Sequence, residues 1–438
     1  MHRAVTASLL LGCAVAFAAT AAEPPSRPGV DAPELAHLGA LSVGVRTVTL
    51  VHRGQVYILA FDPKAGTVPR RDRSLTVDIW YPAQPMSGIA AEIYTASLPS
   101  EPPDPPASFS IPGIAVRGAK AAVGQHPLVV VSHGYSNATV AMSWLTENLA
   151  SKGYVVAAIR HEDPQIGDRS KFAEPLMRRP LDIAFVARTL QASLAAEGLV
   201  DPARTALIGY SMGGYGVLTC AGALLDPAGG AVALVPGGLM LPYARGGNER
   251  AATLVDGLKA VVAISPAGGT LGAWGRDGLG AVAVPLLLID GDVDRTVDYT
   301  TGARAFFGAA TGAQRYLLTF RGGGHALGLG PVPDSMRRRL WDLDWFEDPV
   351  WRKDRIVAIN LHMITAFLDL YVRGDASRAA YIDGLLPESA AGRWPSDAPA
   401  AYDAFSPGDA NGTVWKGFQR RHAEGLELLH AVPEPRGH

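Results

Sequence analysis

The sequence predicts an α/β protein with a mostly parallel central sheet and helices on both faces. Six short apolar runs, rich in Val, Ile and Leu, follow one another from Pro127 onward and are separated by helix-length segments: PLVVVSHG, YVVAAI, TALIGYS, AVVAIS, VPLLLIDG and YLLTF. Runs that are apolar throughout indicate strands covered on both faces, as in a parallel sheet. Strand-like runs at 45–51, 55–61 and 75–81 precede them, and we expect antiparallel strands at that edge of the sheet.

Helices are expected between these strands and after them. Segments of suitable length fall at 139–151, 181–197, 212–224, 298–309 and 354–373. The last of these places Ile356, Ile359 and Met363 on one face, and Gly374 follows it at the position of a C-cap glycine. His52-Arg53-Gly54, between the first two strand-like runs, is interpreted as a hairpin turn.

The composition fits a single large globular domain, expected over residues 23–438. The chain has 438 residues, of which 48% are hydrophobic, and its formal net charge is -2. No stretch concentrates Lys and Arg enough to follow a phosphate backbone, so nucleic-acid binding is not expected. A proline-rich insertion is predicted at about 86–120, because residues 99–113 break all periodicity and read as an extended surface segment or flap.

The N-terminal residues have the pattern of a signal peptide. Arg3 precedes a short apolar run, and Ala19-Thr20-Ala21 matches an A-x-A cleavage site. The run is too short for a stable membrane span. We therefore expect residues 1–22 to be removed and the protein to be periplasmic or secreted. Cys13 lies in a weak lipobox-like context, which leaves lipidation open as an alternative.

The segment LIGYSMGGYG places Ser211 between Gly209 and Gly213 in a G-x-S-x-G pattern. This pattern marks either an ordinary glycine-rich turn or a nucleophile elbow, a strained strand-to-helix turn that holds a serine Oγ at the edge of a sheet. An elbow needs a strand before it and a helix after it. TALI supplies the strand and MGGYGVLTCAGALL the helix, so the sequence favours an elbow with Ser211 as nucleophile.

A serine nucleophile needs a base and an orienting carboxylate, and after an elbow of this kind the acid precedes the histidine in the chain. His325 lies in the glycine-rich loop that follows YLLTF, and three carboxylates end or follow LLLIDG: Asp290, Asp292 and Asp294. The ends of parallel strands open onto one crevice, so both groups are expected there. Asp294 is the predicted acid because it lies beyond the turn, with the loop freedom to reach the histidine. Asp290 is expected to be on the strand still, and Asp292 in the turn.

The oxyanion of such a reaction needs two N–H donors. The elbow supplies one, the backbone N–H of Met212, the residue after the nucleophile. The loop after the strand VVVSHG supplies the second, the N–H of Tyr135. His133 in this loop is expected to be a buried histidine that shapes the loop and transfers no proton.

No metal or cofactor site is predicted. The spacing Asp-x-Asp-x-Asp starts like an EF-hand loop, but Arg295 stands where glycine is needed and Thr301 where a bidentate Glu belongs. No H-x-H or H-E-x-x-H spacing marks a metal site. The segment RGGGHALGLG opens no helix and lacks the spacing of a dinucleotide loop.

Six segments carry a resemblance to a known family: VDIWYPA, PLVVVSHGYSN, ENLASKGYVVAAIRHED, RPLDIAFV, GYSMGG and LHMITAFLDLYVRGD. From about residue 45 to 373 the chain resembles the α/β-hydrolases, and more narrowly the bacterial predicted dienelactone hydrolases, relatives of platelet-activating-factor acetylhydrolases. The resemblance implies a central sheet of about eight strands and a set of functional residues: Ser211, Asp294, His325, Tyr135 and Met212.

Two departures from that family limit what the resemblance says about substrate. Dienelactone hydrolases use a cysteine nucleophile, where this chain has serine. The acetylhydrolases carry their acid one strand earlier, where AVVAISPAGG has no carboxylate.

Together these features predict an exported serine hydrolase that cleaves a small carboxylic ester through an acyl-enzyme, without a cofactor. An amidase or peptidase with the same triad is the nearest alternative, because the pocket walls decide the leaving group. A non-catalytic binding protein on the same fold is a third hypothesis.

An aromatic segment follows the histidine loop at about 330–352. It carries Trp341, Trp345, Phe346 and Trp351. One interpretation is a satellite core beneath an insertion. The other is a lid at the mouth of the crevice, in which Trp341 and Trp345 bind an apolar part of the substrate.

Overall fold

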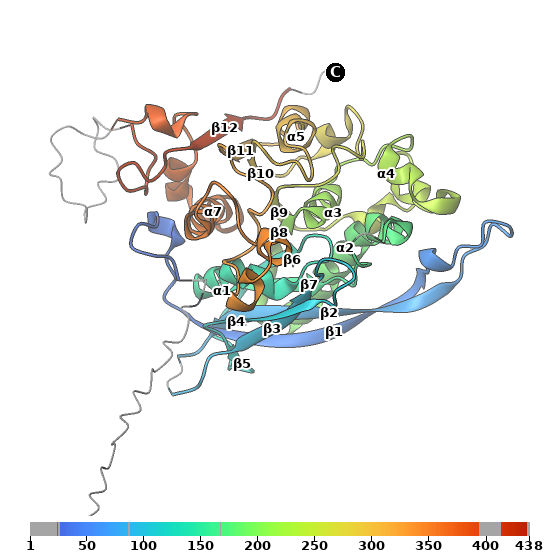
Figure 1. Cartoon of the computed structure of the whole chain (residues 1–438), viewed down its shortest axis with the longest axis horizontal. Helices are drawn as coiled ribbons and strands as arrows, with labels where there is room; N and C mark the ends of the chain where they lie inside the picture. Colours follow the sequence, from blue (N-terminus) through green and yellow to red (C-terminus); the bar gives the residue numbers. More distant parts are fainter. Residues whose placement is uncertain (1–23, 25–26, 86–87, 167, 394–412, 436–438) are drawn as a thin grey trace, which may run out of the picture.

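The computed structural model describes residues 24, 27–85, 88–166, 168–393 and 413–435, so the predicted signal peptide, residues 1–22, lies outside the described residues. The described chain is built around a ten-stranded sheet with the order β12-β11-β10-β9-β8-β6-β7-β2-β1-β5 (Figure 1). The predicted fold class, a mostly parallel sheet between helices, is confirmed. The sheet has more than the expected eight or so strands because short strands are added at its edges.

The parallel part of the sheet consists of the six apolar runs that the sequence predicts: β6 (His126–Ser132), β7 (Val155–Arg160), β8 (Val200–Tyr210), β9 (Leu258–Ile264), β10 (Leu286–Gly291) and β11 (Arg315–Phe320). Side chains along each strand alternate between two cores. In β6, Val129 and Val131 belong to one core, whereas Leu128 and Val130 belong to the other. Because both faces are buried, these strands show no polar alternation.

Antiparallel strands extend the sheet at both edges. β1 (Ser42–Val56) pairs with β2 (Arg70–Ala83), β2 pairs antiparallel with β7, and the two-residue β5 (Val116–Arg117) joins β1. At the other edge, β12 (Leu426–Ala431) lies antiparallel to β11. The sequence did not predict β12, because its run LELLHA contains Glu427 and His430 and lacks the continuous apolar character of the parallel strands.

The predicted strand at 55–61 and the predicted hairpin turn at 52–54 are wrong. β1 continues to Val56 through a β-bulge between His52 and Gln55. Gly54, with φ 63°, serves this bulge and not a hairpin turn. The next residues, Ile58–Ala60, form a 3₁₀ turn, η2.

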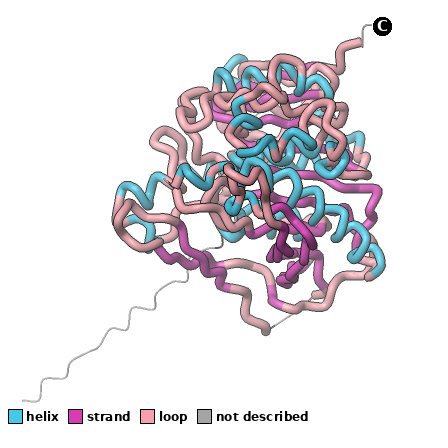
Figure 2. Tube along the Cα trace, turned by 90° about the vertical axis from the view of Figure 1, so that its right-hand side faces the viewer, coloured by secondary structure: helices cyan, strands magenta, loops and turns pink. Residues whose placement is uncertain are grey.

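Helices cover both faces of the sheet. α1 (Ser143–Ser151) and α7 (Lys353–Leu368) contribute to the core on one face, and α2 (Ala173–Ala196), α3 (Met212–Cys220) and α5 (Ala305–Ala309) to the core on the other (Figure 1). α4 (Gly230–Ala233) and α6 (Leu340–Asp344) are short. Much of the remaining surface is loop (Figure 2).

α2 begins earlier than predicted, at Ala173, and contains Pro180. A proline inside a helix cannot donate to the carbonyl one turn before it, here that of Leu176. The Tyr215 hydroxyl of α3 donates to this carbonyl at 2.9 Å instead. A contact from a neighbouring helix therefore lets α2 run through a residue that normally ends one.

The predicted helix at 354–373 and its C-cap are confirmed. α7 continues into a π-helical turn, η11 (Asp369–Arg373), and Gly374 follows with φ 76°. Among the described residues, the run Lys353–Arg373 is the one helix long and apolar enough to cross a membrane, and 83% of its apolar window is buried inside the protein. A buried position of this kind is typical of a core helix.

A separate hairpin forms where the sequence predicts no core element. β3 (Ile93–Leu98) and β4 (Ala107–Pro112) pair with each other, and the side chains of Phe109 and Ile111 are buried in the core. The expectation of an unpacked segment over 99–113 is therefore wrong for β4. Phe109 and Ile111 alternate with Ser108 and Ser110, a strand pattern that the surrounding prolines hide.

Candidate active site

Ser211 lies in a tight turn between β8 and α3. Its backbone has φ 53 and ψ -114 degrees, a strained conformation for a residue with a Cβ. A Cβ on Gly209 would lie 2.3 Å from the carbonyl oxygen of Gly213, and a Cβ on Gly213 would lie 1.9 Å from that of Ser132. Backbone contacts therefore require both glycines of the motif, and the segment has the geometry of a strand-to-helix elbow.

The predicted acid and histidine lie at the ends of neighbouring strands. Asp294 follows β10, His325 follows β11, and these two strands pair in parallel. Nε2 of His325 lies 3.0 Å from Oγ of Ser211. Nδ1 of the same ring lies 2.6 Å from Oδ2 of Asp294. The structure thus brings the three predicted residues into one hydrogen-bonded chain.

The other two aspartates face different partners. Asp292 accepts the N–H of Gly322 at 2.6 Å and lies 3.4 Å from the guanidinium of Arg321, away from the histidine. Asp290 is 0% exposed. Burial and the neighbouring Asp294 carboxylate raise the pKa of Asp290 well above its ordinary value. Asp290 is therefore a poorer candidate than Asp294 for the negative charge that orients a histidine.

Asp294 is held ionised in spite of its burial. Burial acts to raise its pKa, but the hydrogen bond and charge of His325 outweigh burial, and the pKa of Asp294 lies below its ordinary value. Its Oδ1 also accepts the N–H groups of Thr296 at 2.8 Å and Val297 at 3.2 Å. These bonds leave Oδ2 free to accept from the imidazole.

The two predicted oxyanion donors are both adjacent to Ser211. Met212 is the first residue of α3, where an N–H has no partner within the helix. A Cβ on Gly134, the residue before Tyr135, would lie 3.4 Å from Cβ of Ser211. No backbone hydrogen bond within the described part of the chain uses the Tyr135 N–H.

A buried arginine beneath the Tyr135 loop is a site residue that the sequence interpretation missed. Arg179 of α2 is 1% exposed, and its guanidinium donates to the carbonyl oxygens of His133 and Gly134. It also pairs with Asp163, whose carboxylate accepts the N–H of Ser136 at 2.9 Å. The loop is therefore held from beneath on both sides of the predicted donor. The signal in the sequence was a charged residue within the apolar helical run RPLDIAFV, because a buried charge needs a partner.

His133 occupies the structural position expected for it. Nδ1 of its ring lies 2.7 Å from the carbonyl oxygen of Gly134, and its Nε2 accepts the N–H of His161 at 3.1 Å. Burial, with a smaller effect from Arg179, lowers the pKa of His133 to about 4. The ring is therefore neutral and bonded to the backbone.

The loop that carries His325 is held by charged side chains of a later segment. Asp348 accepts the N–H of Gly324 at 2.7 Å, and the buried Lys353 donates to the carbonyl oxygen of Ala326. The two bonds act on the residues directly before and after the histidine. Burial lowers the pKa of Lys353 to about 8.

A pocket of about 440 Å³ opens at the Ser211 hydroxyl. Ser211 and His325 line it together with four aromatic residues, Tyr135, Tyr210, Trp341 and Trp345. Trp341 is 37% exposed. The two tryptophans lie where the sequence predicts a substrate-binding wall, and their role in binding stays a prediction.

Residues 339–345, which we call the wall segment, are attached to the proline-rich loop between β3 and β4. The indole N–H groups of Trp341 and Trp345 both donate to the Pro99 carbonyl oxygen, at 3.4 and 3.1 Å. The Ser100 hydroxyl donates to Asp342 at 2.8 Å. The two segments that the sequence treats as separate insertions therefore support each other.

The other two aromatic residues of the predicted lid belong to the core. Phe346 is 0% and Trp351 8% exposed. Their rings pack edge-on against Phe109 of β4 and Phe320 of β11. Each of the two interpretations of this aromatic segment therefore fits half of its aromatic residues.

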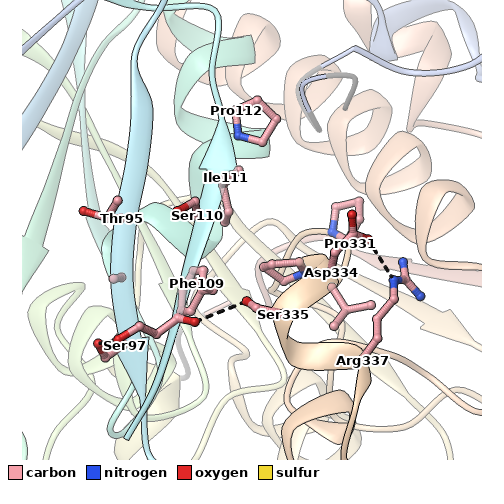
Figure 3. A pocket seen from close by; sticks show the side chains of 14 residues that line it. Thr95, Ser97, Phe109, Ser110, Ile111, Pro112, Pro331, Asp334, Ser335 and Arg337 are labelled. Carbon is pink, nitrogen blue, oxygen red and sulfur yellow. Dashed lines mark hydrogen bonds and ion pairs between the residues drawn. The ribbon is translucent and has the colours of Figure 1, made fainter. Parts of the chain in front are cut away.

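A second cavity, of about 730 Å³, lies between the β3–β4 hairpin and residues 331–337 (Figure 3). Serine and threonine hydroxyls of the hairpin line one side, and the ion pair of Asp334 with Arg337, 3.5 Å apart, lies on the other. Ser335 donates to the Ser108 carbonyl at 3.2 Å. None of the three residues of the hydrogen-bonded chain lines this cavity.

Within the part of the chain that the structure describes, no group of three His, Cys, Asp or Glu side chains is arranged to hold a metal ion.

Comparisons with known proteins agree with this architecture. A family model described as PET hydrolase-like matches residues 115–236, a range that contains the Tyr135 loop and the elbow. A ferulic acid esterase from Streptomyces cinnamoneus aligns with a TM-score of 0.50 over 76% of this chain and 91% of that one. The chain has the α/β-hydrolase fold. The sequence identity to that esterase is 22%, so the structural likeness shows the fold alone.

Curated relatives of this α/β-hydrolase are cutinases. It is 27% identical to cutinase 2 of Thermobifida cellulosilytica over 181 residues, which are 41% of this chain and 52% of that protein. A cutinase of Thermobifida alba is 34% identical over 94 residues, 21% of this chain and 29% of that protein. The chain spans about half the length, or less, of the curated relatives it matches.

Proposed function

We propose that this α/β-hydrolase cleaves carboxylic esters through an acyl-enzyme on Ser211. The observation that carries the proposal is the continuous hydrogen-bonded chain from Ser211 through His325 to Asp294, at the strained turn between β8 and α3. A serine hydroxyl becomes a useful nucleophile only with such a base, and the base needs an orienting carboxylate.

The proposed reaction has two halves. His325 takes the proton of the Ser211 hydroxyl as Oγ attacks the ester carbonyl, and the N–H groups of Tyr135 and Met212 stabilise the oxyanion. The ester C–O bond then breaks, and the imidazolium protonates the departing alcohol. In the second half, His325 deprotonates a water that attacks the acyl carbonyl, which releases the acid and restores Ser211. Asp294 orients the imidazole and stabilises its charged form throughout.

The names of the proteins that the chain resembles support an ester, and not an amide, as the substrate. The proteins it resembles carry the names cutinase, PET hydrolase-like and ferulic acid esterase, all of which describe ester hydrolysis. An amidase or peptidase uses the same triad, so the choice needs a direct comparison of p-nitrophenyl acetate with the matching p-nitroanilide. We expect turnover of the ester to exceed that of the anilide by several orders of magnitude.

Covalent labelling tests the nucleophile. A fluorophosphonate should modify one site, because only an activated serine attacks phosphorus quickly, and peptide mapping should place the adduct on Ser211. An adduct on another serine, or label that survives in Ser211→Ala, would contradict the proposal. Absence of both labelling and ester turnover would instead support a non-catalytic binding protein.

We also propose that the protein is exported to the periplasm or secreted. The signal-peptide pattern of residues 1–22 supports this location. N-terminal sequencing of the protein from a periplasmic or culture fraction should find Ala22 or Glu23, at the predicted cleavage site, as the first residue. A mature protein that retains Met1 in the cytosolic fraction would contradict export, and one that begins at a modified Cys13 would indicate lipidation.

A further inference from the structure

One face of the wall segment points to the Ser211 pocket, and that face carries a charge. Trp341, Asp344 and Trp345 are three and four residues apart at α6, so they share one side of the helix. All three line the pocket. Asp342, by contrast, bonds to Ser100 of the proline-rich loop.

Asp344 is the one fixed charge among the residues that line this pocket. The lining contains no second Asp and no Glu, Lys or Arg. Of the arginines nearby in the chain, Arg337 pairs with Asp334 and Arg339 with Asp104. Among the described residues, no cationic side chain forms an ion pair with Asp344.

Aromatic side chains line the pocket together with this carboxylate. Trp341, Trp345 and Tyr135 line the same pocket. Both indole N–H groups are turned to the Pro99 carbonyl oxygen. The tryptophans therefore offer the pocket mainly apolar ring surface, and ring faces attract cations, quaternary ammonium groups above all. An unpaired carboxylate beside such rings strengthens that attraction and repels anions.

We propose that the pocket selects esters that carry a positive charge, of the quaternary ammonium class, and discriminates against esters that carry a carboxylate. The inference rests on the proposed esterase function. The cationic group lies against the wall segment, near Asp344, while the ester carbonyl reaches the Oγ of Ser211.

A pair of esters with the same shape and different charge tests the proposal. Acetylcholine and 3,3-dimethylbutyl acetate differ in one atom, the nitrogen that is replaced by carbon. We expect kcat/KM for acetylcholine to be higher by about 5- to 10-fold at low ionic strength. The ratio should fall toward one in about 0.5 M NaCl, because salt screens the charge of an exposed carboxylate.

Two matched variants locate the effect. Asp344→Asn should lower the ratio of the two kcat/KM values by about threefold or more. Asp334→Asn is the control: Asp334 lies on the same stretch of chain, its side chain is 96% exposed, and it does not line the Ser211 pocket. This control should keep the wild-type ratio. A wild-type ratio of one, or an unchanged ratio in Asp344→Asn, would overturn the proposal.

Other measurements separate this proposal from the esterase function. p-Nitrophenyl acetate has no cation, so its Ser211-dependent turnover tests the esterase function alone. If no ester is turned over, ligand-detected NMR still tests the cation site by comparing choline with 3,3-dimethyl-1-butanol. Choline should bind more tightly, and Asp344→Asn should remove the difference. Equal binding of the two compounds by the wild-type protein overturns the proposal whether or not the protein is an esterase.

Discussion

The side of the pocket formed by Ser211, Asp294 and His325, which we call the catalytic side because these are the proposed catalytic residues, differs from the wall segment in what holds its side chains. On the catalytic side each residue follows the end of a parallel strand, and Ser211 and Asp294 are 9% and 4% exposed. On the wall, Leu340 is 71% exposed. The wall is held mainly by side-chain bonds to a loop that lies far away in the sequence.

This difference separates chemistry from selectivity. The strand ends and the strained turn place the catalytic groups through the backbone, so small displacements there are expected to cost much rate. The wall contacts only the part of the substrate that does not react. Substitutions on the wall are therefore expected to change which ester is cleaved, whereas substitutions on the catalytic side stop cleavage.

Removal of the nucleophile or the base should have the largest effect. Ser211→Ala and His325→Ala should each lower kcat for p-nitrophenyl acetate by about 10⁴- to 10⁶-fold, and the double variant by little more, because the residues act as a unit. Steady-state kinetics with thermal melts would measure this. If either folded variant retained more than about a tenth of the turnover, the chemistry would take place elsewhere. The difference between the catalytic side and the wall segment would then not separate chemistry from selectivity.

The choice of the acid is the next largest effect. Asp294→Asn should lower kcat by about 10³- to 10⁴-fold, because the amide favours the wrong imidazole tautomer. Asp292→Asn is the matched control, since that carboxylate bonds to Gly322 and Arg321 on the far side of the turn. The kcat of Asp292→Asn should stay close to that of the wild-type protein. A reversed order would make Asp292 the orienting acid.

Two buried arginine–aspartate pairs, each with one member on α2, allow a test of how the Tyr135 loop is positioned. Arg179 pairs with Asp163 beneath the Tyr135 loop, whereas Asp182 binds Arg73 of β2 at 2.9 Å and does not contact that loop. Arg179→Lys keeps the charge but loses the fork of donors. It should lower kcat by about 10- to 100-fold with little change in KM, because the oxyanion donor is displaced.

Asp182→Asn is the control for that variant. It breaks an equally buried pair, so it should lower the melting temperature and leave kcat near wild type. If Arg179→Lys lowers the melting temperature with unchanged kcat and unchanged affinity for a trifluoromethyl ketone, its role is structural and the arginine does not position the loop.

The smallest effects are expected on the wall. Trp341→Ala or Trp345→Ala should raise KM for hexanoate and naphthyl esters by about 5- to 20-fold and for acetate esters by much less, through lost apolar contact. The melting temperature should change little. Phe346→Ala, one residue further on and fully buried, should instead destabilise the fold by about 3–5 kcal/mol. Equal losses on all esters, with a lower melting temperature, would show that the two tryptophans are core residues.

Local patterns in the sequence predicted the parallel strands and the residues that meet at Ser211. Each of the six apolar runs is a strand, because a strand buried on both faces has a composition that does not depend on its neighbours. The order of serine, acid and histidine could be read because all three follow strand ends, which a parallel sheet places at one edge. The choice of Asp294 over Asp292 as the acid rested only on the position of Asp294 after the turn.

Contacts between distant segments decided the rest. Trp345 meets Pro99 across 246 residues. Arg179 contacts the Tyr135 loop from the N-terminal part of α2, a helix that the sequence predicts to begin later. Side-chain partners of this kind have no local signature, because a pattern of residues along the chain does not say which other segment lies beside it. The sequence by itself determined the sheet, the elbow and the order of the catalytic groups. Only the tertiary structure decided which aromatic residues face the pocket and that the pKa of Asp290 is raised, since burial and the pKa depend on neighbours that folding brings together.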